Sequence, residues 1–183
     1  ASSTDLNARR IIAYGLRNPF RFGLRPGTQQ LWVGDVGWNT WEEINRVADV
    51  DDGVAENFGW PCYEGAGRQG GYDGANLNRC ESLYAGAGQT GPFYTYNHGA
   101  QVVPGDACPI GSSSITGIAF EDGSNYPADY DGALFFADAA RGCIWVMKRG
   151  TGADPAPGLI SPFVSGGGQV VQHECPAGPG QAD

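Results

Sequence analysis

The residues best suited to chemistry lie in one stretch near the start of this 183-residue sequence. Arg17 and Asn18 stand in a Gly-Leu-Arg-Asn-Pro segment, and the paired acids Glu42 and Glu43 follow a Gly-Trp loop. A guanidinium group is a planar, forked cation that binds carboxylates, and bent backbone beside acids can bind a hard cation. The stretch therefore predicts a site for a polycarboxylate ligand and a hard metal cation.

Each of these residues also has a purely structural interpretation. Arg17 could pair with an ordinary surface acid, because most arginines are solvated. Asn18 precedes a proline and could simply shape a turn. Exposed strand positions are the ordinary place for Glu42 and Glu43. The residue types alone leave both interpretations open.

Short β-strands must position these residues, because no segment longer than about ten residues has helical periodicity. The chain contains 30 Gly and 12 Pro, which is typical of many strands joined by tight turns. Apolar runs between these turns predict strands at residues 10–14, 20–24, 31–33, 42–47, 93–96, 116–120, 133–137 and 143–148, and a last short strand at 163–165.

This spacing of strands predicts an all-β sandwich, barrel or propeller. The phrases Leu31–Asp35 and Leu134–Asp138 both combine an apolar strand with a small residue and a final aspartate, which favours the propeller. A blade takes roughly forty to fifty residues, so the chain has room for about three to four blades. That is fewer than a closed ring needs, so we expect part of a propeller.

The glycine-rich segment 62–91 has no predicted strand or helix, and a loop of this length is functional or cross-linked. Within it, Gly65–Gly70 fits G-x-G-x-x-G, but without a predicted strand before it or a helix after it we expect a flexible loop. No cysteines have C-x-x-C spacing, so disulfides are expected, with Cys175 left over. The predicted pairs are Cys62–Cys80 and Cys108–Cys143.

The overall charge of the chain excludes one class of partner. The formal net charge is -9 and the pI is about 4.5, whereas a nucleic-acid-binding surface is basic. No apolar run approaches the roughly 20 residues of a membrane helix. Five cysteines indicate a secreted or periplasmic, extracellular protein.

A few other residues have both a chemical and a structural interpretation. His98 could act as a general base if a partner and a cleft position it, although packing in a loop is the commoner role. Asp35 and Asp138 end predicted strands, where we expect them to cap turn amides. Among the tryptophans, Trp38 and Trp41 are the ones expected near a ligand, and the others are expected in the core.

Several short motifs occur in a distinctive order: Gly15-Leu-Arg-Asn-Pro, Gly34-Asp-Val-Gly-Trp-Asn, Glu43-Ile-Asn45, Asn57-Phe-Gly-Trp-Pro61, Ile115-Thr-Gly117, Tyr130-Asp-Gly-Ala-Leu-Phe-Phe-Ala-Asp138 and Arg141-Gly-Cys-Ile-Trp145. Together they resemble the glucose/sorbosone dehydrogenase family over roughly residues 10–172. This family includes soluble aldose dehydrogenases dependent on pyrroloquinoline quinone (PQQ) and Hedgehog-interacting relatives that share the propeller. We therefore expect a partial propeller over residues 1–172 and an irregular tail over 173–183.

The resemblance implies a six-bladed propeller with PQQ and calcium on its top face. Carried over residue by residue, Arg17 and Asn18 match the Arg-Asn pair that contacts the quinone. Gly37 and Trp38 match the two positions whose carbonyls bind the active-site calcium. Glu43 matches an acid at a second, structural calcium site.

The implied activity is oxidation of the C1 hydroxyl of an aldose sugar by hydride transfer to PQQ, with an external electron acceptor. The sequence departs from this pattern in that the family's catalytic histidine belongs to N-terminal blades that precede Gly15. Trp38 stands where the soluble glucose enzyme has proline, and Ala140 stands where it has a lysine that contacts the quinone. These departures leave an alternative, a non-catalytic propeller module that binds protein or carbohydrate.

Overall fold

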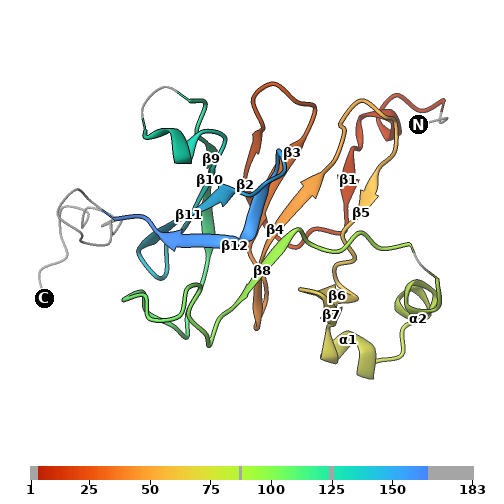
Figure 1. The fold of residues 1–183 in the computed structure, drawn as a ribbon. Coiled ribbons are helices and arrows are strands. Elements are labelled where there is room, and N and C mark those ends of the chain that lie inside the picture. Colours follow the sequence, from red (N-terminus) through yellow and green to blue (C-terminus); the bar gives the residue numbers. More distant parts are fainter. Residues whose placement is uncertain (1–3, 87, 124–125, 165–183) are drawn as a thin grey trace, which may run out of the picture.

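The computed structural model describes residues 4–86, 88–123 and 126–164, and these form mostly short strands (Figure 1). Among the described residues, no helix is long and apolar enough to cross a membrane. The elements in chain order are η1 Ala8–Arg10, β1 Ala13–Tyr14, β2 Pro19–Leu24, β3 Leu31–Asp35, β4 Trp41–Val47, β5 Glu56–Asn57, β6 Tyr63–Glu64, β7 Gly67–Arg68, α1 Gly70–Gly74, α2 Asn78–Ala85, β8 Tyr94–Asn97, β9 Ile115–Phe120, η2 Ala128–Tyr130, β10 Leu134–Asp138, β11 Cys143–Arg149 and β12 Pro155–Pro162.

Strands β2, β3, β4 and β8 form the first of two four-stranded antiparallel sheets, in that spatial order. The register pairs Val33 of β3 with Phe22 of β2 and with Asn45 of β4. Four of the five β3 residues are buried, whereas Phe22 and Leu24 of the neighbouring strand β2 are exposed. We call this sheet the first blade.

Strands β9 to β12 form the second sheet, in the order β12-β11-β10-β9, and we call it the second blade. In both blades the strands follow one another across the sheet in chain order, which is the meander of a propeller blade. The inner strands β2 and β9 pack side by side (Figure 1). The apolar core lies between the two blades and includes Trp32, Ile44, Ile115, Phe136 and Trp145.

Most strands predicted from hydrophobic alternation are confirmed within one or two residues. The strand predicted at 10–14 is shorter, because Ala8–Arg10 is a 3-10 turn and only Ala13–Tyr14 pairs, in parallel with β5. The last strand was predicted at 163–165, where residue 165 lies outside the described residues; the last strand of the described part lies earlier, at Pro155–Pro162. The strand was missed because prolines usually argue against a strand. They are tolerated here because β12 lies at the edge of the sheet, where a backbone N–H on the outer side has no strand to bond.

The all-β propeller class is confirmed, but the described residues complete two four-stranded blades where length indicated three to four. The difference arises because the described residues between 58 and 91 form a separate lobe rather than blade strands (lower right in Figure 1). The tail 173–183, with Cys175, lies outside the described residues.

The lobe contains the hairpin β6–β7 and the helices α1 and α2, cross-linked by the predicted disulfide Cys62–Cys80. The prediction of a flexible loop without helix is wrong here. Gly65–Gly70 follows β6 and leads into α1, whose N-terminus is capped by the side chain of Gln69 accepting the Tyr72 amide. The helices are too short for periodicity to reveal them.

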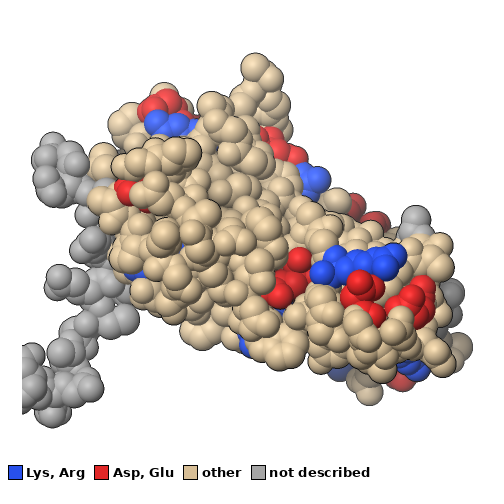
Figure 2. Space-filling model, turned by 90° about the horizontal axis from the view of Figure 1, so that it is seen from below, with Lys and Arg blue, Asp and Glu red and all other residues tan. Residues whose placement is uncertain are grey.

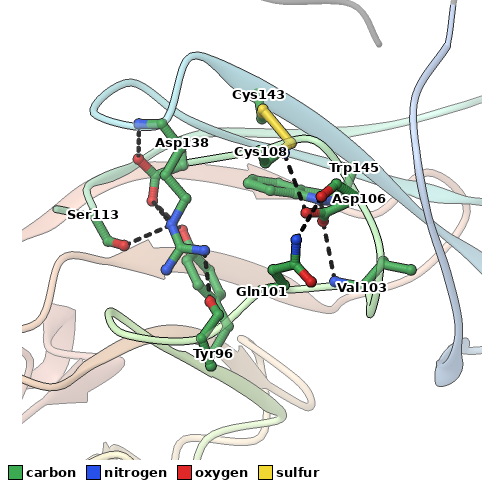
Figure 3. Close-up of a disulfide and its surroundings, with 11 residues drawn as sticks. Tyr96, Gln101, Val103, Asp106, Cys108, Ser113, Asp138, Cys143 and Trp145 are labelled. Carbon is green, nitrogen blue, oxygen red and sulfur yellow. Dashed lines mark hydrogen bonds and ion pairs between the residues drawn. A yellow bond between two sulfur atoms is a disulfide. The ribbon is translucent and has the colours of Figure 1, made fainter. Parts of the chain in front are cut away.

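The second predicted disulfide, Cys108–Cys143, is also present and joins the loop 98–114 to the first residue of β11 (Figure 3). Asp106 strengthens this attachment. Its carboxylate accepts hydrogen bonds from the amide of Val103 at 3.1 Å and from the indole of Trp145 at 2.9 Å. The loop is therefore fixed over the end of the second blade.

Candidate functional site

The loops 36–40 and 98–114 lie on the same side of the molecule, at the bottom of Figure 1. Figure 2 shows this side from below as a mainly uncharged surface, with the largest group of charged side chains in the lobe at the right. The predicted site residues gather around the first of these loops, so we describe it first.

A single carboxylate oxygen holds the loop that connects β3 to β4. Oε1 of Glu64 accepts hydrogen bonds from four consecutive amides, residues 38–41, at 2.8 to 3.2 Å. Burial opposes ionisation of Glu64, but these four bonds outweigh it and lower the pKa of the carboxyl. A glutamate 23 to 26 residues away in sequence thus sets the loop's conformation. No local signal in the sequence pointed to this role.

Gly37 makes the tight path of the loop possible. A Cβ at this position would lie 1.6 Å from the carbonyl oxygen of Trp41, so every other residue would clash with backbone. The carbonyl groups of Val36 and Gly37 turn towards Arg17, whose Nη1 donates to them at 3.0 and 2.8 Å. The loop therefore presents consecutive carbonyl oxygens to a cation.

Asp35 brings Arg17 and Asn18 to this loop, as expected of an aspartate that caps turn amides. Its two carboxylate oxygens accept the backbone amides of Arg17 at 2.9 Å and Asn18 at 2.6 Å. Burial raises the pKa of Asp35 in spite of these bonds. Three predicted site residues, Arg17, Asn18 and Gly37, thus lie together at the end of β3.

Glu43 lies on β4 and is buried, so the expectation of an exposed strand acid is wrong for it. Its oxygens accept the amide of Gly65 at 2.6 Å and the side-chain amide of Asn45 at 2.9 Å. Burial raises the pKa of Glu43 to about 7. Beside it, Oδ1 of Asn45 is buried without a hydrogen-bond partner. Within the described residues, however, no three His, Cys, Asp or Glu side chains cluster as metal ligands.

Glu42 is 0% exposed and is likewise wrongly expected at the surface. Its Oε1 lies 2.8 Å from Nε2 of His98, and its Oε2 accepts the amide of Ile115 at 2.8 Å. Burial raises the pKa of Glu42 to about 7 and lowers the pKa of His98. His98 therefore has the buried partner that an acid-base group requires, and it also ties the loop 98–114 to β4.

Arg141 has an anchoring role that sequence reasoning missed. Its side chain is 0% exposed and donates to the backbone carbonyls of Asn97, His98 and Ala100 and to the hydroxyl of Ser113. Asp138 accepts the amide of Arg141 at 3.0 Å, which confirms the turn-capping role expected of this aspartate. The signal in the sequence was an arginine before a glycine in a predicted turn, which is too common to be specific.

An aromatic cluster lies beside the loop. Trp38 is 46% exposed, and its ring centroid lies 5.6 Å from that of Trp60 and 6.1 Å from that of Tyr72. The guanidinium of Arg17 lies 5.7 Å from the ring of Trp60. Trp41, the other tryptophan expected near a ligand, lies against Gly65 at the base of the lobe, where its ring leaves no room for a Cβ.

The arrangement combines a half-buried cation, turned carbonyl groups and aromatic surface at one loop. Such groups can bind a planar anionic molecule by charge and stacking, while the carbonyl oxygens suit a hard cation. The second blade offers no comparable group at its equivalent turn, because Arg141 is fully buried and Ala140 is small.

Comparisons with known proteins agree with this picture. One solved structure, the PQQ-bound form of an aldose sugar dehydrogenase from Streptomyces coelicolor, superposes with a TM-score of 0.51 at 20% sequence identity. The match covers 87% of this chain and 34% of the other, so the chain spans about a third of that protein's length. At this identity the match establishes the fold. None of the curated proteins matches the chain.

A family profile described as glucose/sorbosone dehydrogenase matches residues 2–154, which is most of the chain. The resemblance of the sequence motifs is thereby confirmed. The chain belongs to the glucose/sorbosone dehydrogenase family.

Proposed function

We propose that this chain forms the cofactor-side part of a secreted quinoprotein that oxidises the C1 hydroxyl of aldose sugars. The observation that carries the proposal is the loop 36–40, where Arg17, Asn18 and the carbonyl of Gly37 lie together in a chain of this family. The similar solved structure is of a PQQ-bound aldose sugar dehydrogenase, which supports PQQ as the cofactor.

The residues around the loop fit such a cofactor and its cation. Among the described residues, the hydrogen bonds of the Arg17 guanidinium start from Nη1, which leaves Nε and Nη2 for an anionic ligand. The carbonyl of Gly37 already faces a positive charge at 2.8 Å. A calcium ion at Gly37 and Trp38 would repel Arg17 unless an anion bound with it, so we expect PQQ and calcium to bind together.

When bound, PQQ would accept the hydride and calcium would polarise its carbonyl group. The chain's own contribution is positional: Asp35 fixes the backbone of Arg17 and Asn18, and Glu64 fixes the loop that carries Gly37 and Trp38. For the second calcium, the buried and unpaired Oδ1 of Asn45 beside Glu43 is a suitable oxygen donor. The family's general base lies in the N-terminal blades, and an external acceptor would reoxidise the quinone.

The proposal is tested by titrating the purified chain with PQQ and calcium and following the quinone absorbance. We expect binding that needs both, and Arg17→Ala should weaken it at least about tenfold, as the loss of one charge-assisted contact does. Arg149→Ala is the matched control, because Arg149 pairs with Asp131 near the far end of β11. No quinone binding, by the chain alone or joined to further propeller blades of the family, would refute the proposal.

A second candidate is a non-catalytic propeller module that binds carbohydrate or protein. It is favoured by Ala140, which offers no cation to a quinone, and by the exposed ring of Trp38. This candidate predicts ligand binding without any response to PQQ.

A further inference from the structure

We infer that Trp38, Trp60 and Tyr72 form a stacking platform for one pyranose ring of an oligosaccharide, next to the loop 36–40. The binding itself stands on the geometry below. The assignment of an oligosaccharide as the substrate rests on the proposed function, in which the reducing-end ring is the one oxidised.

The three rings hold one another in a fixed arrangement. The planes of Trp38 and Trp60 are inclined at 81°, those of Trp60 and Tyr72 at 66°, and those of Trp38 and Tyr72 at 58°. Edge-to-face contacts of this kind are the favoured aromatic geometry. Because rings packed edge to face cover only part of one another, Trp38 keeps 46% of its surface exposed.

A hollow of about 280 Å³ lies against this cluster. Trp38 and Tyr72 supply aromatic walls, while Gly71 and Ala75 have little or no side chain to fill the space between them. Leu77 completes the lining and is itself 46% exposed. Sites for drug-sized ligands occupy about 300–1,000 Å³, so this hollow suits a smaller unit such as one sugar ring.

The chemistry of the lining suits a pyranose rather than a charged ligand. Aromatic faces carry negative quadrupole charge, and the C–H bonds on one face of a pyranose carry positive charge. The hydroxyl groups at the edge of a sugar need polar partners. In the same lobe, Asp73 directly follows the lining residue Tyr72 and forms an exposed ion pair with Arg68 at 3.1 Å, so polar groups adjoin the lining in sequence.

The platform is continuous with the proposed cofactor side. Trp38 directly follows Gly37, and the guanidinium of Arg17 lies 5.7 Å from the ring of Trp60. A sugar whose reducing end reached the loop could therefore place its next ring on the platform. A single aldose would use the loop alone, so the geometry favours reducing oligosaccharides.

The test measures saccharide binding to the purified chain, without PQQ. Intrinsic tryptophan fluorescence and saturation-transfer NMR would be recorded with cellotriose, maltotriose and glucose. We expect at least one trisaccharide to bind saturably, at least about tenfold more tightly than glucose. Trp38→Ala and Tyr72→Ala should each weaken that binding at least about tenfold.

Two further variants keep the test decisive. Leu77→Ala changes the hollow without touching the aromatic cluster, so it should weaken binding even if Trp38→Ala disturbs folding. Tyr126→Ala removes an exposed tyrosine of the second blade and should leave binding unchanged. Circular dichroism would confirm that each variant is folded. Absence of trisaccharide binding, or equal binding by wild type and Leu77→Ala, would overturn the inference.

The outcomes also separate this inference from the proposed function. Saccharide binding without quinone binding would support the platform and refute the quinoprotein. Quinone binding without saccharide binding would do the opposite. If a protein partner instead of a saccharide were bound through Trp38, the platform would be refuted as a sugar site.

Discussion

The second strand of each blade ends in an aspartate, Asp35 in the first blade and Asp138 in the second. Each carboxylate accepts a backbone amide from an arginine: Asp35 from Arg17 at 2.9 Å, and Asp138 from Arg141 at 3.0 Å. The connection that follows each aspartate lies on the same side of the molecule. The two blades thus share a position where an aspartate orients an arginine.

The arginines differ in how completely the protein uses them. Arg141 is fully buried and bonds four groups through Nε, Nη1 and Nη2, so its donors serve the loop 98–114. Arg17 is half-buried and bonds two carbonyls through Nη1. The same Asp–Arg arrangement therefore uses the whole guanidinium to hold a loop in the second blade. In the first blade it leaves guanidinium donors for a ligand. This contrast is the structural reason for placing the site at the first blade.

The largest effect is expected from Arg141→Met. Removing this cation leaves three backbone carbonyls without their donor and takes away the positive charge 3.8 Å from the buried Asp138, which should lower the free energy of unfolding by about 3–5 kcal/mol. Arg17→Met should lower it by only about 1 kcal/mol, because the Arg17 side chain is half-buried and only two carbonyls lose a donor. Urea denaturation monitored by tryptophan fluorescence measures both values. Equal losses for the two variants would contradict the comparison.

The two disulfides should also differ in how much they stabilise the protein and in which part of it they stabilise. In the chain-entropy model, replacing Cys108 and Cys143 by alanine costs about 4 kcal/mol and replacing Cys62 and Cys80 costs about 3 kcal/mol. The part of the chain that loosens should differ more between the two variants than the loss in the free energy of unfolding does. Loss of Cys62–Cys80 should raise hydrogen exchange within the lobe 58–91 alone. Exchange that rose equally in both blades would show that the lobe is not independently anchored.

Glu64→Ala tests whether a distant acid holds the loop of the first blade. The amides of residues 38–41 lose their shared acceptor, and we expect a loss of about 2 kcal/mol in the free energy of unfolding. The emission of Trp38 should shift to longer wavelength as the loop loosens. Glu64→Gln keeps one oxygen and serves as the control, with a smaller loss. An unchanged emission spectrum in Glu64→Ala would contradict this role.

The smallest effect concerns contacts between the blades, where Asp154 pairs with Arg25 and Arg46. Burial raises the pKa of Asp154, but hydrogen bonds from Gln30 and Arg25 and the charge of Arg46 outweigh it and lower the pKa below 3.8. Stability from these pairs is therefore present above pH 3.8 and lost as pH falls through the lower, folded-state pKa.

Asp154→Asn should cost about 1 kcal/mol at pH 7, because a carboxylate that is 37% exposed is screened by solvent. The difference from wild type should shrink as the pH falls below 3.8, and denaturation at several pH values measures it. Asp129→Asn, which breaks the more exposed pair with Lys148, is the control and should change stability less. A difference that persisted undiminished at low pH would contradict the assignment.

Much of the fold was predictable because local spacing determines it. Alternating apolar residues marked the blade strands, and the two Asp-ending phrases marked equivalent strands of two blades. Both predicted disulfides are present, and the short separation of Cys62 and Cys80 indicated the first of them. The predictions failed where local rules were outweighed, as in β12, where prolines are compatible with an edge strand, and in α1 and α2, which are too short for periodicity.

The candidate site was predictable only in part. The sequence by itself determined the residue types at the loop, namely the Arg17-Asn18 pair, Gly37 and an aspartate at the end of a strand, because these depend on neighbouring residues and turn chemistry. Only the tertiary structure decided that Glu42 and Glu43 are buried and that His98 pairs with Glu42. It alone also decided that Glu64 accepts amides of the loop 36–40 and that an aromatic cluster lies beside this loop. Those contacts join residues 20 or more positions apart, and burial depends on what packs against a strand, which its own pattern does not record.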